Sequence, residues 1–459
     1  MSDAIDRLGT EEVARRLGVK RETVYAYVSR GLLERHPDSG PHDSQFDPEE
    51  VERLAARARR PDRSSALEVV VETELTLLDP AGRLSYRGRD AIELARFRSF
   101  EEVVALLWDG APPTPWGLDD ERAAAVEALR TALGPEAPGA ERIAAVVATL
   151  AARDPDRDSR DPETVRRAGA TVFAAVLTAL DRGRPSVRPS ECGRPDVRLP
   201  DLKTTAREAV DQRTTAPAEA DARSTAPSGA PGRSPAGAGV AERLWVALAE
   251  GDVRPRAGQV KALEAALNLL ADHELAASTF AARVAASAWA GPYRVILAGL
   301  GPLGGALHGG AGAAVEAMLD EVADGADPGA ALDPRLTSGA APGAALNARR
   351  SPGPPPGFGH RVYRDRDPRA DHLLDRLGPD PLAAALLDAA AERDLPAPNV
   401  DFALAALVRS HGLRPGSAAT IFTVARIAGI VAHALEEYEH RLRFRPRASY
   451  VGPAPPATP

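Results

Sequence analysis

The chain has 459 residues, a length typical of roughly two to four domains, and its formal net charge of -8 argues against a protein that coats nucleic acid non-specifically. Its single cysteine, Cys192, excludes an internal disulfide and a multi-cysteine zinc site, as expected of a cytoplasmic protein. No uninterrupted run of 18 apolar residues occurs, so we expect no membrane span. Only 4% of the residues are aromatic and alanine-rich stretches recur at helical spacing, so we expect a mainly α fold.

Residues 1–60 predict a small winged helix-turn-helix module. Thr10 would cap a helix that ends at Leu17, Gly18 would form the turn, and Lys20 or Arg21 would open a second helix. Residues 31–40 and 46–60 would add a β-wing and a further helix.

The second helix of this module is the candidate DNA-binding element. Side chains facing outward from it would touch base edges and phosphates, and we expect these to be Lys20, Arg21, Thr23 and Tyr25. Residues 7–58 resemble the winged helix-turn-helix of MerR-type and excisionase proteins, which implies DNA as a partner. The module is nearly neutral overall, so a helical appendage that binds protein, or nothing, is the alternative.

Residues 66–183 predict the first part of a larger helical domain. The DPAG sequence at residues 79–82 predicts a turn after an alternating apolar segment, and residues 91–108 predict an amphipathic helix pair. Helical spacing continues from residue 140 to 181. Residues 184–240 contain no aromatic side chain and are dense in Pro, Ser, Thr, Ala and Gly, which predicts a disordered insertion within one domain.

Residues 241–288 predict two helices, the second with Asp272, His273 and Glu274 in one turn. Adjacent residues do not share a helix face, so we expect no metal site there. His273 is then either a hydrogen-bonded structural histidine or a ligand of a substrate.

A glycine-rich stretch surrounds His308. It has no GK[ST] sequence and no preceding strand, which argues against a nucleotide loop. At a helix start the dipole would lower the pKa of His308 and keep the ring neutral, so that it can donate a hydrogen bond to a carbonyl that becomes an enolate.

Residues 356–370, PGFGHRVYRDRDPRA, predict an anion site. Gly357 and Gly359 allow positive φ beside His360, and several arginines follow, including Arg369. Guanidinium groups match carboxylates and phosphates, although a solvated basic loop is the alternative.

The last third of the chain predicts two more site residues. Pro398 and Asn399 start a helix whose first turn holds Asp401, either as a functional carboxylate or as a helix cap. Arg426 lies alone in a long apolar helix, where burial of its charge requires an anion.

These segments, ADHEL, GALHGGA, GFGHRVYRDRDPR and PNVD, together resemble the active-site segments of the citrate synthase family. The resemblance implies a mainly α fold with a large and a small helical domain. The large domain would comprise residues 66–183, 241–306 and 406–452, the small domain residues 307–405, and residues 453–459 would form a tail.

The resemblance also implies an acyltransferase that condenses acetyl-CoA with oxaloacetate to citrate. Asp401 would be the base, His308 would stabilise the enolate, and His360 would polarise the ketone. His273, Arg369, Arg426 and Arg445 would bind oxaloacetate, with Arg445 reaching into the neighbouring site of a homodimer. The coenzyme A thioester would be a substrate, with no further cofactor.

Two other functions fit the same sequence. A 2-methylcitrate synthase would use propionyl-CoA, which differs from acetyl-CoA by one methylene, worth only about 1 to 3 kcal/mol in a pocket. Alternatively, a DNA-binding regulator would use a synthase-like body to sense ligand without turnover.

Overall fold

The structure is a computed structural model, and its described residues are 7–17, 19, 21–29, 33, 35–36, 39–40, 44–48, 51, 70–79, 82–110, 116–181, 238–251, 253–305, 308–333 and 354–446. The chain forms two units, Met1–Glu72 and Thr73–Pro459. Each unit has its own hydrophobic core.

The first unit contains helices α1, Thr10–Leu17, and α2, Arg21–Ser29, where two helices were predicted. Strand β1, Leu8–Gly9, pairs antiparallel with β2, Gln45–Phe46. Its core contains Val13, Val24 and Phe46, which have no exposed surface. Lys20 and most of the helix predicted to end this module lie outside the described residues.

The second unit begins with a small antiparallel sheet. Its strands are β3, Thr76–Leu78, β4, Leu84–Tyr86, and β5, Arg89–Asp90, in the order β3-β4-β5. Gly82, with φ of 85°, closes the predicted turn by donating its N–H to the Asp79 carbonyl at 2.7 Å.

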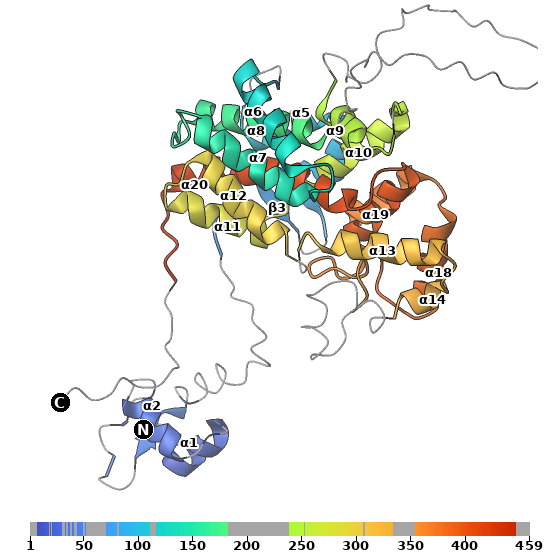
Figure 1. Cartoon of the computed structure of the whole chain (residues 1–459). Helices are drawn as coiled ribbons and strands as arrows, with labels where there is room; N and C mark the ends of the chain where they lie inside the picture. Colours follow the sequence, from blue (N-terminus) through green and yellow to red (C-terminus); the bar gives the residue numbers. More distant parts are fainter. Residues whose placement is uncertain are drawn as a thin grey trace, which may run out of the picture. The chain divides into compact units, whose positions relative to one another are not determined.

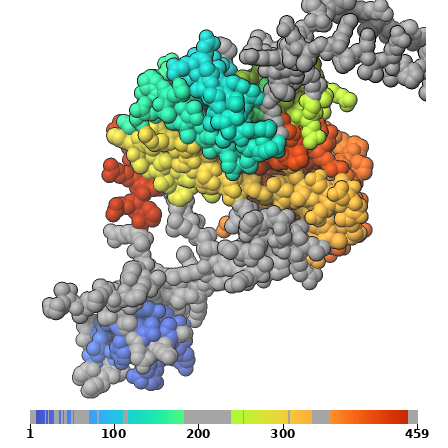
Figure 2. Space-filling view, viewed as in Figure 1, coloured from blue at the N-terminus to red at the C-terminus, as the bar shows by residue number. Residues whose placement is uncertain are grey.

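Helices form the remainder of this unit (Figure 1). They are α4 (Ala91–Phe97), α5 (Phe100–Leu107), α6 (Asp120–Leu133), α7 (Gly139–Arg153), α8 (Pro162–Leu180), α9 (Val240–Leu248), α10 (Ala257–Leu270), α11 (Ala277–Ser287), α12 (Pro292–Leu303), α13 (Ala311–Ala323), α14 (Pro328–Ala331), α17 (Pro368–Leu377), α18 (Pro381–Ala391), α19 (Val400–Ser410) and α20 (Ser417–His440). In Figure 2 the surface of α6 to α8, in cyan and green, lies beside that of α11 and α12, in yellow, and of these helices α7 and α8 contact α12.

Local capping explains where the predicted helix pair breaks. Asp90 caps α4 by accepting from the N–H groups of Ile92 and Glu93. Ser99 and Glu102 form a capping box that starts α5. The predicted insertion at residues 184–240 lies outside the described residues except at its end, where α9 begins.

The prediction for residues 241–288 was wrong in one respect. Three helices, α9, α10 and α11, occupy the segment, and Asp272, His273 and Glu274 lie between α10 and α11. Glu274 has a φ of 54°, which a continuous helix does not permit.

Helix α20 is the central helix of the second unit. It is long and apolar enough to cross a membrane, but 89% of its most apolar window is buried inside the protein. The indole of Trp108 donates to the Ala428 carbonyl at 2.9 Å within this core. At Gly139, a Cβ would lie 2.2 Å from Thr420 Oγ1, so glycine lets α7 approach α20 closely. Its burial is that of a core helix in a soluble protein.

The second unit has two hydrophobic clusters. The larger contains residues of the sheet, of α4 to α12 and of α20, and the smaller draws on residues between Val315 and Ala406. Helix α19 belongs to both, because Leu404 packs in the larger cluster and Phe402 in the smaller. The start of α19 therefore lies where the two clusters meet. The boundaries at residues 307 and 405 stay a prediction.

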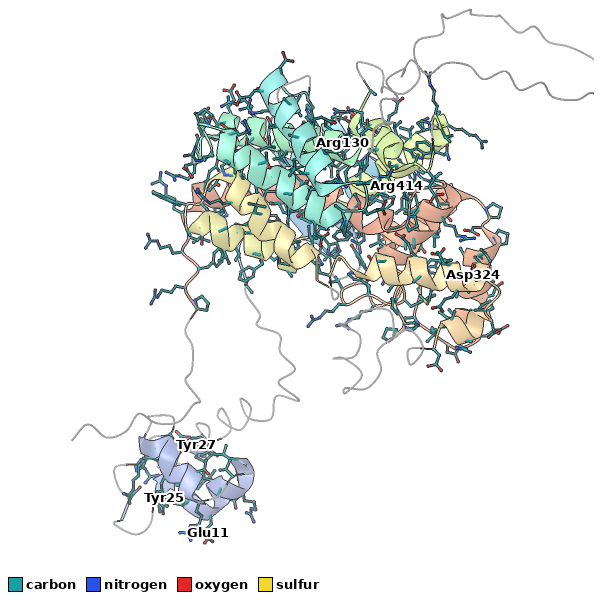
Figure 3. All side chains as sticks on the ribbon, in the orientation of Figure 1. Glu11, Tyr25, Tyr27, Arg130, Asp324 and Arg414 are labelled. Carbon is teal, nitrogen blue, oxygen red and sulfur yellow. The ribbon has the colours of Figure 1, made fainter. Side chains whose placement is uncertain are left out.

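The two sides of the predicted insertion belong to one packed body. Arg414, labelled in Figure 3, follows α19, and its backbone N–H donates to the Leu248 carbonyl at the end of α9, at 2.9 Å. Its Nη2 donates to the Ala247 carbonyl at 2.5 Å. The chain after the insertion thus packs with the chain near the C-terminal end.

Candidate active site

The predicted site residues lie on separate elements of the second unit. His273 lies between α10 and α11, His308 before α13, His360 in the loop before α17, Arg369 in α17, Asp401 in the first turn of α19, and Arg426 within α20. Helices α13 and α19 lie side by side and both contact α20 (Figure 1).

Hydrogen bonds fix the loop that carries His360 to the start of α19. Asn399 donates its backbone N–H to the Gly357 carbonyl and its Nδ2 to the Gly359 carbonyl, both at 2.8 Å. Gly357 and Gly359 have φ of 86° and 72°, as predicted. A Cβ on Gly357 would lie 2.8 Å from a methyl of Val315, so only glycine permits this approach.

The backbone selects the tautomer of His360. Its Nδ1 accepts from the N–H groups of Val362 at 3.1 Å and Tyr363 at 3.2 Å. Burial and the nearby Arg369 lower the pKa of His360 to about 4, so the ring is neutral at pH 7. A neutral ring that accepts at Nδ1 carries its proton on Nε2 and can donate there to a substrate oxygen. Arg369 Nη2, itself a donor, lies 3.4 Å from this nitrogen.

His273 lies beside this ring. Its Nε2 is 3.1 Å from the Tyr363 hydroxyl, and its ring centroid is 5.4 Å from that of His360 in an edge-to-face arrangement. The guanidinium of Arg369 lies 5.0 Å from the centroid of the Tyr363 ring. These contacts bring a predicted substrate histidine and a predicted substrate arginine together.

Asp401 does not cap its helix. The cap is Asn399, whose Oδ1 accepts from the N–H groups of Asp401 and Phe402. The Asp401 carboxylate has no hydrogen bond or ion pair to another residue of the described chain. Burial raises the pKa of Asp401 to about 6; Arg369 lowers it in part and Asp367 raises it.

Asp367 holds Arg369 in place. Its carboxylate accepts from Arg369 Nε at 2.9 Å and from Nη2 at 2.8 Å, in a buried two-bond pair. It also accepts from the Val400 N–H at 3.0 Å. Burial alone would lower the pKa of Arg369, but the contact with Asp367 raises it. One carboxylate therefore joins the guanidinium to the helix that carries Asp401.

His308 precedes α13, which begins at Ala311. Its Nε2 lies 2.9 Å from the Ser278 hydroxyl, and its ring packs edge to face on Phe422 at 5.7 Å. Burial, followed by the charge of Arg426, lowers the pKa of His308 to about 4. The ring is neutral as predicted, and burial is the main cause of the lowered pKa.

Arg426 is buried and incompletely paired. Its Nε donates to the Leu270 carbonyl at 3.0 Å, and its guanidinium lies 5.0 Å from the Phe422 ring centroid. Its Nη1 is a buried atom without a hydrogen-bond partner among the described residues. Burial lowers the pKa of Arg426, and Asp272 raises it in part. This nitrogen is available to an anion.

His273 links these groups electrostatically. Burial lowers its pKa well below the ordinary value, and nearby positive or ionisable groups lower it further: Arg369, Arg426, His360 and His308. Both guanidinium groups and both other imidazoles therefore act on one ring. Of the residues predicted for catalysis and for oxaloacetate binding, Asp401 joins this group through Arg369, and only Arg445 lies outside it among the described residues.

Arg445 lies apart from this group. It is exposed on the extended segment that follows α20, and it forms no hydrogen bond or ion pair with the described residues of its own chain. Phe444 packs on Phe280 of α11, with ring centroids 5.6 Å apart. The role of Arg445 in a neighbouring subunit, which the resemblance implied, stays a prediction.

The other arginines of the predicted anion loop do not enter the site. Arg366 pairs with Asp371 on the surface at 2.7 Å, and Arg361 and Arg364 are exposed. The loop is thus an anion site at Arg369 and a solvated basic surface elsewhere.

The metal-type residues beside His273 have other partners. Asp272 accepts from the Thr76 hydroxyl at 2.6 Å and lies 3.3 Å from His433 Nε2. Within the described ranges, no group of three or more His, Cys, Asp or Glu residues has an arrangement that could hold a metal ion.

Sequence reasoning missed three polar residues of the site. Asp367 had a signal, because an aspartate before a proline that opens a helix is a typical cap. Ser278 and Tyr363 had none, since their contacts with His308 and His273 join residues that are distant in sequence.

A family model described as "Citrate synthase, C-terminal domain" matches residues 66–447. Among curated relatives, a citrate synthase of Haloferax volcanii is 32% identical over 415 residues, covering 84% of this chain and 94% of the relative. A 2-methylcitrate synthase of Mycobacterium tuberculosis is 30% identical over 423 residues, covering 86% of this chain and 91% of the relative.

Solved structures give the same result for the fold. The crystal structure of citrate synthase from Pyrobaculum aerophilum superimposes with a TM-score of 0.57 and 26% sequence identity, over 84% of this chain and 91% of that chain. The predicted fold class is therefore confirmed for the second unit.

Proposed function

The chain belongs to the citrate synthase family of acyltransferases, and on that premise we propose that it condenses acetyl-CoA with oxaloacetate to give citrate and coenzyme A. One observation carries the proposal. A carboxyl with a raised pKa, neutral imidazoles and buried guanidinium groups gather around His273 and Arg369. Condensation needs a base, hydrogen-bond donors for developing oxyanions, and cations for a dicarboxylate.

Asp401 is the proposed base. With a pKa of about 6 it is mainly ionised at pH 7, yet basic enough to take a proton from the methyl group of the thioester. The enolate oxygen accepts a hydrogen bond from the neutral imidazole of His308. The Nε2–H of His360 donates to the ketone oxygen of oxaloacetate.

The bond changes follow from these positions. The methyl carbon of the thioester attacks the ketone carbon, a carbon-carbon bond forms, and the former ketone oxygen takes a proton to become a hydroxyl. Water then attacks the thioester carbonyl, the carbon-sulfur bond breaks, and coenzyme A leaves as the thiol. The thioester is a substrate, and the proposal includes no further cofactor.

Oxaloacetate carries two carboxylates, and the site offers two buried guanidinium groups. Arg369 is fixed by Asp367, while Arg426 has an unpaired nitrogen. His273 lies within their field as a neutral ring.

We propose that Arg445 of a second subunit completes this site in a homodimer, since its exposed position allows it to extend to another chain. We also propose a cytoplasmic location.

Thiol release with oxaloacetate and either acetyl-CoA or propionyl-CoA tests the proposal. A kcat/KM for acetyl-CoA at least about tenfold above that for propionyl-CoA supports a citrate synthase, given the free energy of one methylene. The reverse ratio assigns a 2-methylcitrate synthase, the activity named for the Mycobacterium tuberculosis relative. No thiol release with either thioester overturns the enzymatic proposal.

A second function belongs to the first unit, for which we propose binding to duplex DNA through α2. Tyr25 is 48% exposed and lies on the outside of this unit (Figure 3). Thr23 is half-buried beside it. Arg21 pairs with Glu11 at 3.0 Å, but both side chains are largely exposed, so a phosphate can compete for Arg21.

The test is selection of duplexes from a random pool by the full chain, followed by affinity measurement. The variant carrying R21A and Y25A should bind the selected duplex at least about tenfold more weakly. Equal retention of selected and random duplexes would overturn the proposal. DNA binding that responds to oxaloacetate, without thiol release, would instead favour a ligand-sensing regulator.

A further inference from the structure

Tyr363 contacts three predicted residues of the candidate site, and none of the roles described above belongs to it. It lies in the loop between His360 and α17, with only 3% of its surface exposed. Its ring centroid is 4.7 Å from that of His360 and 5.6 Å from that of His273. The guanidinium carbon of Arg369 lies 5.0 Å from the same centroid.

Among the described residues, the hydroxyl of Tyr363 makes one polar contact, with His273 Nε2 at 3.1 Å. Burial raises the pKa of Tyr363 to about 12, so the group remains a neutral hydroxyl at any working pH. The imidazole of His273 is neutral as well, because its pKa lies well below the ordinary value. A neutral imidazole carries one N–H, and its partner decides which nitrogen bears it.

Donation from the hydroxyl to Nε2 leaves the proton of His273 on Nδ1. No hydrogen bond joins this Nδ1 to another residue of the described chain. A free N–H beside two guanidinium groups is suited to a carboxylate oxygen of the substrate. The tyrosine hydroxyl would thus turn the ring into an oriented donor.

We infer that Tyr363 is a positioning residue for the dicarboxylate substrate: its hydroxyl fixes the ring and tautomer of His273, and its aromatic face supports Arg369. This inference rests on the proposed function. Gly82 makes room for the ring, because a Cβ there would lie 3.3 Å from Tyr363 Cδ1. The turn of the small sheet thereby reaches the site.

Tyr363→Phe isolates the hydroxyl. It keeps the ring over which Arg369 lies, and it keeps the backbone N–H that donates to His360 Nδ1. We expect the KM for oxaloacetate to rise about tenfold, the effect of one hydrogen bond to an ionic substrate, with kcat changed less than about twofold. The KM for the thioester should not change.

The matched control is Tyr293→Phe. The Tyr293 hydroxyl is also buried and donates to Asp154 at 2.6 Å, but it joins α12 to the loop after α7, away from the site. This control should lower thermal stability without changing the KM for oxaloacetate. A change of kcat and KM together in Tyr363→Phe, matched by a loss of stability, would indicate packing alone.

A double-mutant cycle decides whether the hydroxyl acts through His273. In a His273→Ala background, Tyr363→Phe should have no further effect on the KM for oxaloacetate. Additive effects of the two substitutions, or an unchanged KM in Tyr363→Phe alone, would overturn the inference. Calorimetric titration measures the dissociation constant of oxaloacetate for the same four proteins. It needs no turnover, so it tests the inference even if the proposed activity is absent.

Discussion

Asp401 combines a buried carboxyl with a lack of partners, and this environment sets its chemistry. Asn399 caps the helix, so the carboxylate of Asp401 accepts no hydrogen bond from the backbone N–H groups of the first turn. Without such bonds, burial dominates and the pKa of Asp401 rises to about 6. A neighbouring side chain thus determines whether the carboxyl is structural or reactive.

Asp401→Asn should abolish turnover, because an amide cannot accept the methyl proton. Affinity for oxaloacetate should stay within about threefold, since cations elsewhere in the site hold the dicarboxylate. Steady-state thiol release together with calorimetry measures both. A large loss of oxaloacetate affinity with residual turnover would contradict the role of base.

The pH dependence follows from the same pKa. Acid protonates Asp401, so kcat/KM for the thioester should fall about tenfold per unit below pH 6. His308 and His360, with pKa values of about 4, should not contribute above pH 5. A rate profile that stays flat down to pH 5 would contradict this assignment.

Protonation of Asp401 should lower turnover but raise the stability of the fold. A raised folded-state pKa means that the fold prefers the protonated carboxyl, so the stability from this preference is fully present only below the ordinary aspartate pKa of 3.8. As pH rises through about 6 it is lost, at a cost of up to about 3 kcal/mol for the ionised group. Asp401→Asn should therefore unfold at a higher temperature than the parent at pH 7.

Local signals made some site residues predictable and left others hidden. Asn399 and Asp401 stand in a short capping pattern, which the structure confirms as the start of α19. The partner of Tyr363 is His273, 90 residues away, and no periodicity in the sequence reports such a contact. The cause of the lowered pKa of His308 was also hidden, because burial depends on the whole fold.

At the level of elements, the bonds between the His360 loop and α19 set the geometry of the site. The side chain of Asn399 binds both elements. Its Oδ1 accepts from the N–H of Asp401 in α19, and its Nδ2 donates to the Gly359 carbonyl in the loop. Phe358 and Pro398 form an isolated β-bridge beside it. The loop and the helix should therefore move as one piece.

Asn399→Ala should lower the free energy of unfolding by about 2 kcal/mol, from the lost cap and the unpaired Gly359 carbonyl. It should also lower kcat, because the base and the ketone-polarising imidazole lose their common support. Asn399→Asp is the matched control that retains the cap but lacks the amide donor. Denaturant titration and thiol release separate the two effects, and an Ala variant equal to the parent in both would refute the connection.

Helix predictions succeeded where amphipathic spacing and caps coincide, as in α4 and α5, and where a long apolar run is buried, as in α20. They failed between α10 and α11, since Asp272 and Glu274 are compatible with a helix by composition. The break there is stabilised by contacts with distant residues, among them the Tyr86 hydroxyl, which donates to the Asp272 carbonyl at 3.1 Å. Helix α6 was not predicted, and only Val126 of its residues is buried.

For the whole molecule, two hydrophobic clusters share α19, and the site lies where that helix begins. The resemblance of short segments to a known family predicted this arrangement, while composition alone predicted only a helical protein. Arg445 lies outside the assembled site of its own chain, so its proposed role depends on whether the protein forms a dimer.

Subunit mixing tests whether Arg445 serves a neighbouring site. Arg445→Ala and Asp401→Asn should each be nearly inactive as homodimers. In an equal mixture about half of the dimers would be heterodimers, and each heterodimer would contain one site with both native residues and one site with neither. The mixture should therefore recover about a quarter of the parent activity. No recovery after verified subunit exchange would exclude sharing of Arg445 between subunits, and full activity of Arg445→Ala would exclude any role.

Arg426 places a positive charge inside the long apolar helix α20, and its Nη1 has no hydrogen-bond partner among the described residues. A dianion that binds beside it would supply the missing acceptor, so the substrate would complete the interior of the protein as well as react in it. Oxaloacetate should then act as a stabilising ligand, raising the melting temperature with its concentration. A cell depleted of this metabolite would hold a shorter-lived pool of the enzyme, because its unoccupied form would be degraded sooner.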